Sequence, residues 1–349
     1  MSTAGKFLLV GALCIISVIT AAILSNNKQS QASDSSSCES APKTLRFSMS
    51  SNNKHPIFSG ASKFKELVEQ STDITVNIFP SAQLGDDRAS IEMLQLGTLD
   101  IAIPSTGPLA NFSSAFNVFD LPFMFQSEAV ADDVLRSNFA GTMLNILKDK
   151  QLIGLDFWEN GFRHLTNSTR AVNTIDDVSG LKIRTMESAL HLDAWQALGA
   201  TPTPMAFKEL FTALQQGTVD GQENPYPNIA LNNLYEVQEY LTDTGHVYTP
   251  LVLLFSAKTW STLSVSEQVA VTKAAKEAGD YQRKVNREMN KQSLAQLNDH
   301  MTITTLPLAE RKKFQQATLP VLEKYKDVIG ENIVTQFQQA IKTAEMNDL

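Results

Sequence analysis

Apolar and polar residues recur along residues 44–345 with the spacings of strands and helices. In SGLKIRTME, residues 179–187, Leu181 and Ile183 point to one side and Arg184 to the other, which is the two-residue period of a β-strand. An arginine keeps its charge, and burying that charge without a partner is costly. The strand therefore predicts either that Arg184 reaches solvent or that an anion meets it, and an anion from outside the chain would make this a binding site.

Similar patterns predict an alternation of strands and helices, which is typical of an α/β fold. The strands are expected at 44–49, 74–79, 99–105 and 153–159, and the helices at 57–70, 86–97 and 188–198. The second helix ends at Gly97, a residue suited to a left-handed C-cap.

The C-terminal part is expected to be helical. Ser264 and Glu267 form a capping-box pattern, and the run that follows to about Leu297 contains no proline. A helix of that length would reach ~45 Å, enough to brace two lobes. Three shorter helices are predicted at 308–317, 319–328 and 331–345.

Two segments 120 positions apart resemble each other: LQLGTLD at 94–100 and LQQGTVD at 214–220. Each follows a helix pattern and leads into a proline-containing loop. One interpretation is that helix–glycine–strand junctions converge on similar residues. The other is that two lobes use the same helix–strand unit, with both loops at the carboxyl ends of strands, where open α/β sheets bind ligands.

The N-terminus differs from the rest. Lys6 precedes an unbroken apolar run at 7–24 and a polar, serine-rich tract, which is the pattern of an exported protein. Cleavage after Ala32 is favoured, with residues 1–32 as a signal peptide, while an uncleaved membrane anchor is the alternative. Residues 33–42 are expected to be a flexible connector. Cys38 is the one cysteine outside the apolar run, so no internal disulfide is expected in the folded part.

Composition and motifs narrow the function. The 349 residues are 43% hydrophobic and 19% charged with net charge −8, which allows a sizeable core and argues against nucleic-acid binding. Hydrolase, metalloprotease, nucleotide and dinucleotide signatures are missing. No His or Cys spacing suggests a metal, and no cofactor is predicted. His164 and His191 are interpreted as structural or surface groups.

The residues that stand out lie between positions 158 and 228. Arg163 lies in ENGFRHLTN, and Arg184 ends a strand just before a helix. Phe207 and Asn224 lie in proline-bracketed loops, Asn224 again at a strand end. An arginine can hold a carboxylate through two parallel hydrogen bonds, an amide can add a donor, and an aromatic ring can pack on the carbon skeleton.

Several segments, in this order and spacing, resemble the substrate-binding proteins of TRAP transporters, the DctP family. They are HPIFSGASKFKELVE, FPSAQLGDDRASIEMLQLGTLDIAI, FDLPFMF, GLKIR, GATPTPMAF and ALQQGTVDGQENP. The resemblance covers about residues 44–345. It implies an α/β, two-lobed periplasmic-binding-protein fold (type II-like), with two mixed sheets flanked by helices and a long helix spanning both lobes.

The resemblance also implies roles for particular residues. Arg184, in GLKIR, corresponds to the main carboxylate clamp and Arg163, in GFRHLT, to a second contact. Phe207 of PTPMAF and Asn224 of DGQENP are implied ligand contacts.

Further contacts are expected on the other lobe and beside the clamp. Asp87 of the GDDR motif and the Ser105–Thr106 pair after the first repeat strand are implied by the resemblance, and Glu187 could read a ligand hydroxyl. A uronate or aldonate would suit such a site, whereas the serine–threonine pair weakens a sialic-acid assignment.

The sequence thus predicts a periplasmic receptor for a small organic acid that hands its ligand to the small and large membrane subunits of a TRAP permease, without catalysis. The lobes are expected at 43–160 with about 250–289, and at 161–249 with about 290–349. Two alternatives stay open: a membrane-anchored sensor with the same fold, favoured by the long apolar N-terminus, and an exported lyase or isomerase acting on hydroxy acids, with Asp87 or Glu187 as its base.

Overall fold

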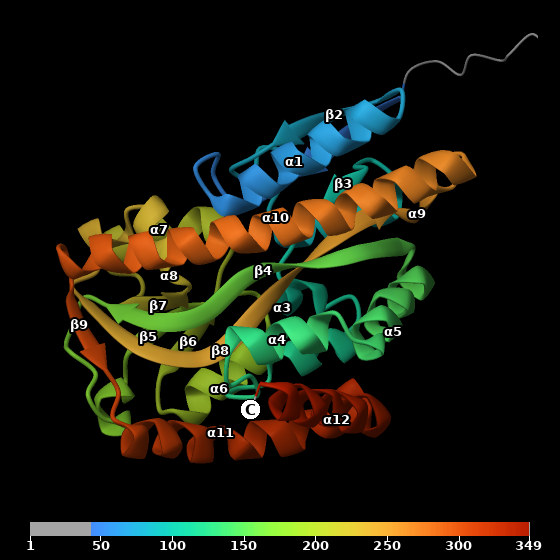
Figure 1. Cartoon of the computed structure of the whole chain (residues 1–349). Coiled ribbons are helices and arrows are strands. Elements are labelled where there is room, and N and C mark those ends of the chain that lie inside the picture. Colours follow the sequence, from blue (N-terminus) through green and yellow to red (C-terminus); the bar gives the residue numbers. More distant parts are fainter. Residues whose placement is uncertain (1–42, 349) are drawn as a thin grey trace, which may run out of the picture. The chain divides into compact units, whose positions relative to one another are not determined.

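The computed structural model describes residues 43–348 (Figure 1). The predicted signal peptide or anchor, the connector and both cysteines lie outside these residues. Among residues 43–348, every helix is too short or too polar to serve as a membrane span.

The strands alternate with helices along the chain. They are β1 (Lys43–Ser48), β2 (Ile74–Phe79), β3 (Ile101–Ala102), β4 (Leu152–Asn167), β5 (Lys182–Thr185), β6 (Thr201–Pro204), β7 (Gly221–Asn224), β8 (Tyr240–Ser256) and β9 (Thr302–Thr305).

The α-helices are α1 (Pro56–Ser71), α2 (Asp87–Leu96), α3 (Thr106–Leu109), α4 (Glu128–Leu135), α5 (Asn138–Ile146), α6 (Ala189–Ala197), α7 (Leu210–Gln215), α8 (Tyr226–Leu231), α9 (Ala257–Trp260), α10 (Val265–Asn298), α11 (Leu308–Ile329) and α12 (Glu331–Asn347). Short 3-10 helices lie at Ser114–Asp120, Leu147–Lys150, Ile175–Val178, Phe207–Glu209 and Leu234–Glu236.

One continuous sheet joins these strands in the order β2-β1-β3-β8-β4-β7-β5-β6, with β9 paired to β8. β1 is parallel to β2 and β3, and β5 is parallel to β6 and β7. The long antiparallel strands β4 and β8 run between these two parallel groups (Figure 1). We expected two sheets; because β4 and β8 each pass from one group to the other, the two are joined into one.

The long helix is confirmed. α10 begins at the predicted capping box, in which the Ser264 hydroxyl accepts from the Glu267 N–H and the Glu267 carboxylate accepts from the Ser264 N–H. Near its start, Ala275 and Ala278 pack in one core cluster with Phe64 of α1. Near its end, Leu297 packs in another cluster with residues of α7 and α8. The helix therefore braces both ends of the sheet.

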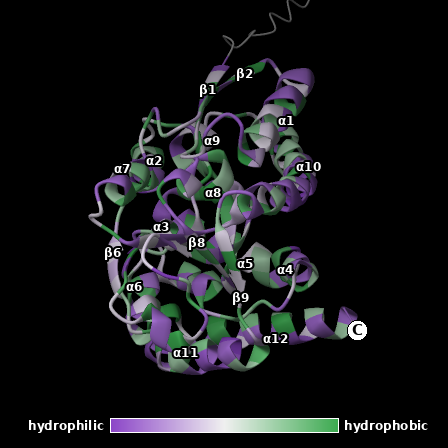
Figure 2. Ribbon diagram, turned by 90° about the vertical axis from the view of Figure 1, so that its left-hand side faces the viewer, coloured by the Kyte–Doolittle hydropathy of each residue, from purple (hydrophilic) through white to green (hydrophobic). Residues whose placement is uncertain are grey.

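The C-terminal helices close a third core cluster, and each buries one face. Val321 and Tyr325 of α11 and Phe337 and Ile341 of α12 pack against α4 and α5 residues in that cluster. Figure 2 shows hydrophilic and hydrophobic residues mixed along α11 and α12, as expected of helices that cover a core. Residues 43–348 belong to one compact unit, and the lobe boundaries within it remain a prediction.

The two similar segments have the same local structure. Gly97 and Gly217 both end a helix with φ near +70°, at 75° and 66°. Asp100 and Asp220 both accept a hydrogen bond from the backbone N–H of a neighbouring strand, at Arg46 and Lys182 respectively. The helix–glycine–strand unit is thus used twice, and β3 and β7, which follow its two copies, lead into loops that line the same cavity.

Candidate functional site

A cavity lies where these two loops meet, and its empty space is about 660 Å³ including the mouth. One side, the N-terminal wall, consists of Ser50, Ser51, His55, Ile57, Asp86, Asp87, Ile103, Ser105 and Pro108. The opposite side, the central wall, consists of Asn160, Arg163, Arg184, Met186, Glu187, Met205, Ala206, Phe207, Asn224, Asn228 and Asn232.

Arg184 on β5 is a buried cation, with 2% of its surface exposed. Its Nε and Nη2 donate to the carbonyl oxygen of Met205 at 2.9 and 2.6 Å. Its Nη1 has no hydrogen-bond partner among residues 43–348. Burial lowers the pKa of Arg184 to about 10, which leaves it charged at neutral pH. The Phe207 ring lies 5.9 Å from its guanidinium carbon.

Arg163 on β4 already has an anionic partner. Its Nε and Nη2 donate to the two carboxylate oxygens of Glu223 at 2.5 and 2.9 Å, and both side chains are buried. Burial alone would raise the pKa of Glu223, but Arg163 and a hydrogen bond from His246 hold it well below its usual range. The sheet register shifts just after Arg163, a place where strands commonly re-aim a side chain. Arg163 Nη1 has no partner among the described residues.

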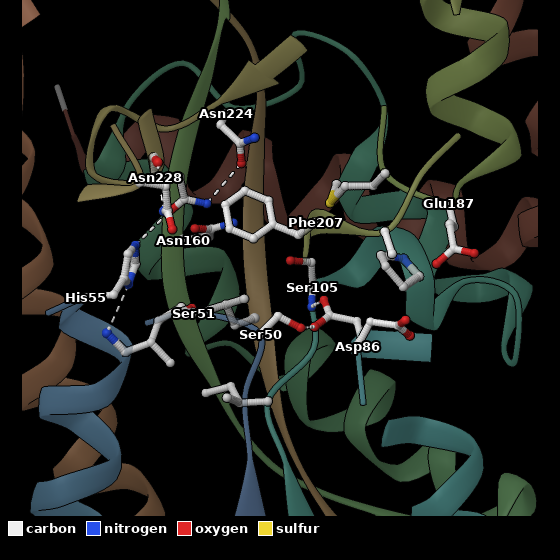
Figure 3. A pocket seen from close by; sticks show the side chains of 18 of the residues that line it. Ser50, Ser51, His55, Asp86, Ser105, Asn160, Glu187, Phe207, Asn224 and Asn228 are labelled. Atoms are coloured by element: carbon white, nitrogen blue, oxygen red, sulfur yellow. Dashed lines mark hydrogen bonds between the residues drawn. The ribbon is translucent and has the colours of Figure 1, made fainter. Parts of the chain in front are cut away.

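A chain of hydrogen bonds connects the two walls through side-chain amides (Figure 3). His55 Nδ1 accepts from the Ile57 N–H, so its Nε2 carries the proton and donates to Asn228 Oδ1 at 2.6 Å. Asn228 Nδ2 donates to Asn224 Oδ1, which also accepts from Arg163 Nη2. Burial lowers the pKa of His55 to about 4, so this histidine is neutral.

The N-terminal wall is organised by Asp87. Its carboxylate accepts from the Ser50 hydroxyl at 2.5 Å and from the Ser105 N–H at 3.0 Å. Enclosure of the carboxyl raises the pKa of Asp87, opposed by these two hydrogen bonds. Ser105 lines the cavity, whereas Thr106, the first residue of α3, is buried beside it and is not among the lining residues.

Further contacts bridge the walls at the rim. Lys208, next to Phe207, pairs with Asp86 at 3.3 Å. The Asn111 amide donates to the carbonyl oxygen of Glu187 at 2.6 Å. The Glu187 side chain itself forms no hydrogen bond within residues 43–348, and it lines the cavity to one side of Phe207 (Figure 3).

The structure therefore brings together seven of the eight residues expected from the sequence: Arg184, Arg163, Asn224, Phe207, Glu187, Asp87 and Ser105. Their roles in binding stay a prediction. Sequence reasoning missed His55, Asn160 and Asn228. Asn228 follows Asn224 by four positions in NPYPN, but Asn224 ends β7 and Asn228 lies in α8, so this spacing is not a helical repeat and gave no signal for Asn228.

No group of three or more His, Cys, Asp or Glu side chains in the described part of the chain is placed to hold a metal ion. The cavity instead offers unpaired guanidinium donors beside apolar side chains and amides. That arrangement can bind and orient an anion with a short carbon skeleton.

Comparison with known proteins agrees with this geometry. The family model described as bacterial extracellular solute-binding protein, family 7, matches residues 47–327. The C4-dicarboxylate-binding periplasmic protein DctP of Rhodobacter capsulatus is 33% identical over 311 residues, covering 87% of this chain and 92% of that protein.

Solved structures of similar proteins cover nearly all of the described residues. The sugar acid binding protein DctPAm of Advenella mimigardefordensis, in complex with galactonate, is 40% identical with a TM-score of 0.85, covering 87% of this chain and 99% of that one. A TRAP periplasmic solute binding protein of Polaromonas sp. JS666, bound to D-erythronate, is 38% identical with a TM-score of 0.82, covering 85% and 98%. These structures confirm the expected α/β fold with its two-lobed character. The chain belongs to the bacterial extracellular solute-binding proteins of family 7, the DctP family of TRAP transporter receptors.

Proposed function

We propose that this protein is an extracytoplasmic receptor that captures a small organic acid and delivers it to the small and large integral subunits of a TRAP-type permease. The observation that carries the proposal is Arg184, a buried guanidinium with an unpaired Nη1 at the cavity. A ligand carboxylate would supply the missing anion, and closure of the walls would exclude water and strengthen the pair.

The similar proteins support this ligand class. One is named for C4-dicarboxylates, and two are solved with the sugar acids galactonate and D-erythronate. We infer that this receptor acts in the periplasm and performs no chemistry on its ligand. Asp87, which could have served as a base, is engaged by the Ser50 hydroxyl and the Ser105 N–H, as a structural carboxylate would be.

A thermal-shift screen tests the proposal. The purified protein is heated with dicarboxylates, uronates, aldonates, keto acids and sialic acid. A ligand at about 100 times its dissociation constant stabilises the fold by about 2.7 kcal/mol, which raises the unfolding midpoint measurably.

The Arg184→Ala variant identifies the site. We expect it to lose the shift, because the carboxylate clamp is gone, while Arg184→Lys keeps the charge without the fork and binds weakly. Lys182→Ala, an exposed position on the same strand, is the matched control and should bind normally. Normal ligand binding by a folded Arg184→Ala variant would contradict the proposal.

A further inference from the structure

The cavity contains one buried cation that has no anionic partner within the described residues. On the central wall, Arg163 is neutralised by Glu223, and Arg184 is bonded only to a carbonyl oxygen. His55 adds no charge, since one ring nitrogen accepts from a backbone N–H and the other donates to an amide. One buried cation is therefore left for a ligand, and it accounts for one carboxylate.

The remaining charged residues of the lining are carboxylates: Asp86, Asp87 and Glu187. Lys208, which follows Phe207 in the chain, lies outside the lining and is paired with Asp86. A second ligand carboxylate would be removed from water, would meet like charges, and would find no cation among the lining residues besides Arg163 and Arg184. These effects disfavour binding.

The cavity also contains a buried acceptor that needs a donor. The Asn160 side chain is buried, and its Oδ1 has no hydrogen-bond partner among residues 43–348. The Glu187 carboxylate, on the same wall, is partly exposed and accepts no hydrogen bond from the residues that the structure describes. A hydroxyl group donates to such acceptors, whereas an ionised carboxylate has no proton to donate. Leaving a buried acceptor unpaired costs free energy, so the Asn160 oxygen favours a hydroxylated ligand, and Glu187 offers a second acceptor to it.

We propose that this pocket selects hydroxylated monocarboxylic acids and discriminates against dicarboxylic acids of the same length. The carboxylate binds at Arg184 and the free Nη1 of Arg163. Asn160 and Glu187 accept from ligand hydroxyls, and Glu187 together with Asp87 repels a second carboxylate. This inference rests on the proposed function and adds the substrate class to it.

Matched pairs of ligands test the selectivity. In each pair an aldonate is compared with the aldarate of the same configuration, so that only the terminal CH₂OH is replaced by a carboxylate. The pairs are erythronate with meso-tartrate, gluconate with glucarate and galactonate with galactarate, and succinate is added as a dicarboxylate without hydroxyls. Isothermal titration calorimetry on the intact purified protein should show at least one aldonate binding about ten- to hundredfold more tightly than its aldarate and than succinate.

The Glu187→Gln variant tests the cause. The side chain has no partner to lose, and removing its charge should narrow the aldonate-to-aldarate ratio by about three- to tenfold, mainly by improving aldarate binding. Glu209→Gln is the matched control, because Glu209 is exposed, nearby in the sequence and outside the lining, and should leave the ratio unchanged. Asn160→Ala should weaken the aldonate and leave succinate unaffected.

The outcomes separate the two levels of the proposal. Succinate or an aldarate binding as tightly as the best aldonate would overturn the selectivity and leave the receptor function standing. Binding of other organic acids without binding of any aldonate would likewise overturn the selectivity and leave the receptor function standing. An unchanged ratio in Glu187→Gln would overturn the assigned cause. No binding of any organic acid would overturn the proposed function itself.

Discussion

Two arginines of the same cavity have different tasks, and the difference lies in their partners. Arg184 is held by the Met205 carbonyl and has no anionic partner in the part of the chain that the structure describes, which is why we propose it as the clamp for a ligand carboxylate. Arg163 is held by Glu223, which in turn is bonded by His246 at 3.1 Å. Glu223 does not line the cavity, so it positions Arg163 and keeps a second buried cation from standing unpaired.

Replacing Glu223 by Gln should therefore destabilise the fold. The substitution leaves the Arg163 charge buried without an anion, and breaking a buried pair in this way costs about 3–5 kcal/mol. Urea unfolding monitored by circular dichroism measures the change. Glu236→Gln, at an exposed position, is the control and should leave the free energy of unfolding unchanged. A Glu223→Gln protein as stable as the parent would show that the pair contributes little.

The sequence indicates some of these residues and not others, for a physical reason. Arg184 draws attention because a charge on a strand that packs into an α/β core requires a partner. Asn160 and Asn228 are uncharged, and asparagine is common in loops and at helix ends, so neither is conspicuous. Their importance comes from contacts with residues far away in the chain, such as the bond between Asn228 and His55. Such contacts between distant segments cannot be predicted from the sequence pattern of either segment alone.

At the scale of helices and strands, local patterns predicted the elements whose signals are complete within a few residues. β1, β2, α1, α2 and the start of α10 lie within one or two positions of expectation. The predicted strand at 99–105 is shorter, since only Ile101 and Ala102 form a strand and Ser105 adds one isolated bridge to Leu251. The predicted strand at 153–159 is longer, because β4 continues to Asn167 alongside β8.

The two helices expected at 308–317 and 319–328 are a single helix, α11, with Pro320 inside it. A proline removes one backbone hydrogen bond and favours a break. Phe314, on the N-terminal side of Pro320, and Val321 and Tyr325, after it, are all buried. We infer that burial of this face outweighs the lost bond, which is an effect of tertiary packing that a local rule cannot include.

The packing of α10 on β4 gives an element-scale prediction. A Cβ at Gly279 would lie 2.4 Å from an Asp156 carboxylate oxygen and 2.8 Å from the Trp158 indole. Gly279→Ala should lower the free energy of unfolding by about 1–3 kcal/mol through overpacking, despite the better helix propensity of alanine.

Gly141 in α5 is the matched contrast. A Cβ at this position meets nothing within 4 Å, so Gly141→Ala should raise the free energy of unfolding by about 0.5–1 kcal/mol. Thermal unfolding of both variants checks the contrast; equal effects would contradict it.

At the scale of the whole molecule, hydrogen bonds between segments about 170–180 positions apart join the two walls of the cavity. Asn52 donates to the Leu231 carbonyl at 3.0 Å, and His55, at the start of α1, bonds Asn228 of α8. His55 also caps α1 through its Nδ1. The neutral imidazole thus serves two contacts at once, and protonation of Nδ1 would remove the acceptor that caps the helix.

This arrangement predicts a pH dependence of stability. Burial, opposed by the bond to Asn228, lowers the pKa of His55 to about 4 in the folded state, while an unfolded histidine titrates near ~6.5. As the pH falls, the unfolded chain therefore takes up a proton before the folded protein does. The contribution of His55 to stability is fully present above pH ~6.5 and is lost as the pH falls toward 4, by on the order of 2–3 kcal/mol.

His55→Gln should flatten the fall in unfolding free energy between pH 6.5 and 4.5, measured by urea denaturation at several pH values. His246 and Glu223 also favour loss of stability in acid, but both are present in the parent and in the His55→Gln variant. The difference between the two pH slopes therefore reports on His55 alone. His300→Gln, at an exposed position, should keep the parental slope, and a parental slope in His55→Gln would show that this histidine does not link the walls to pH.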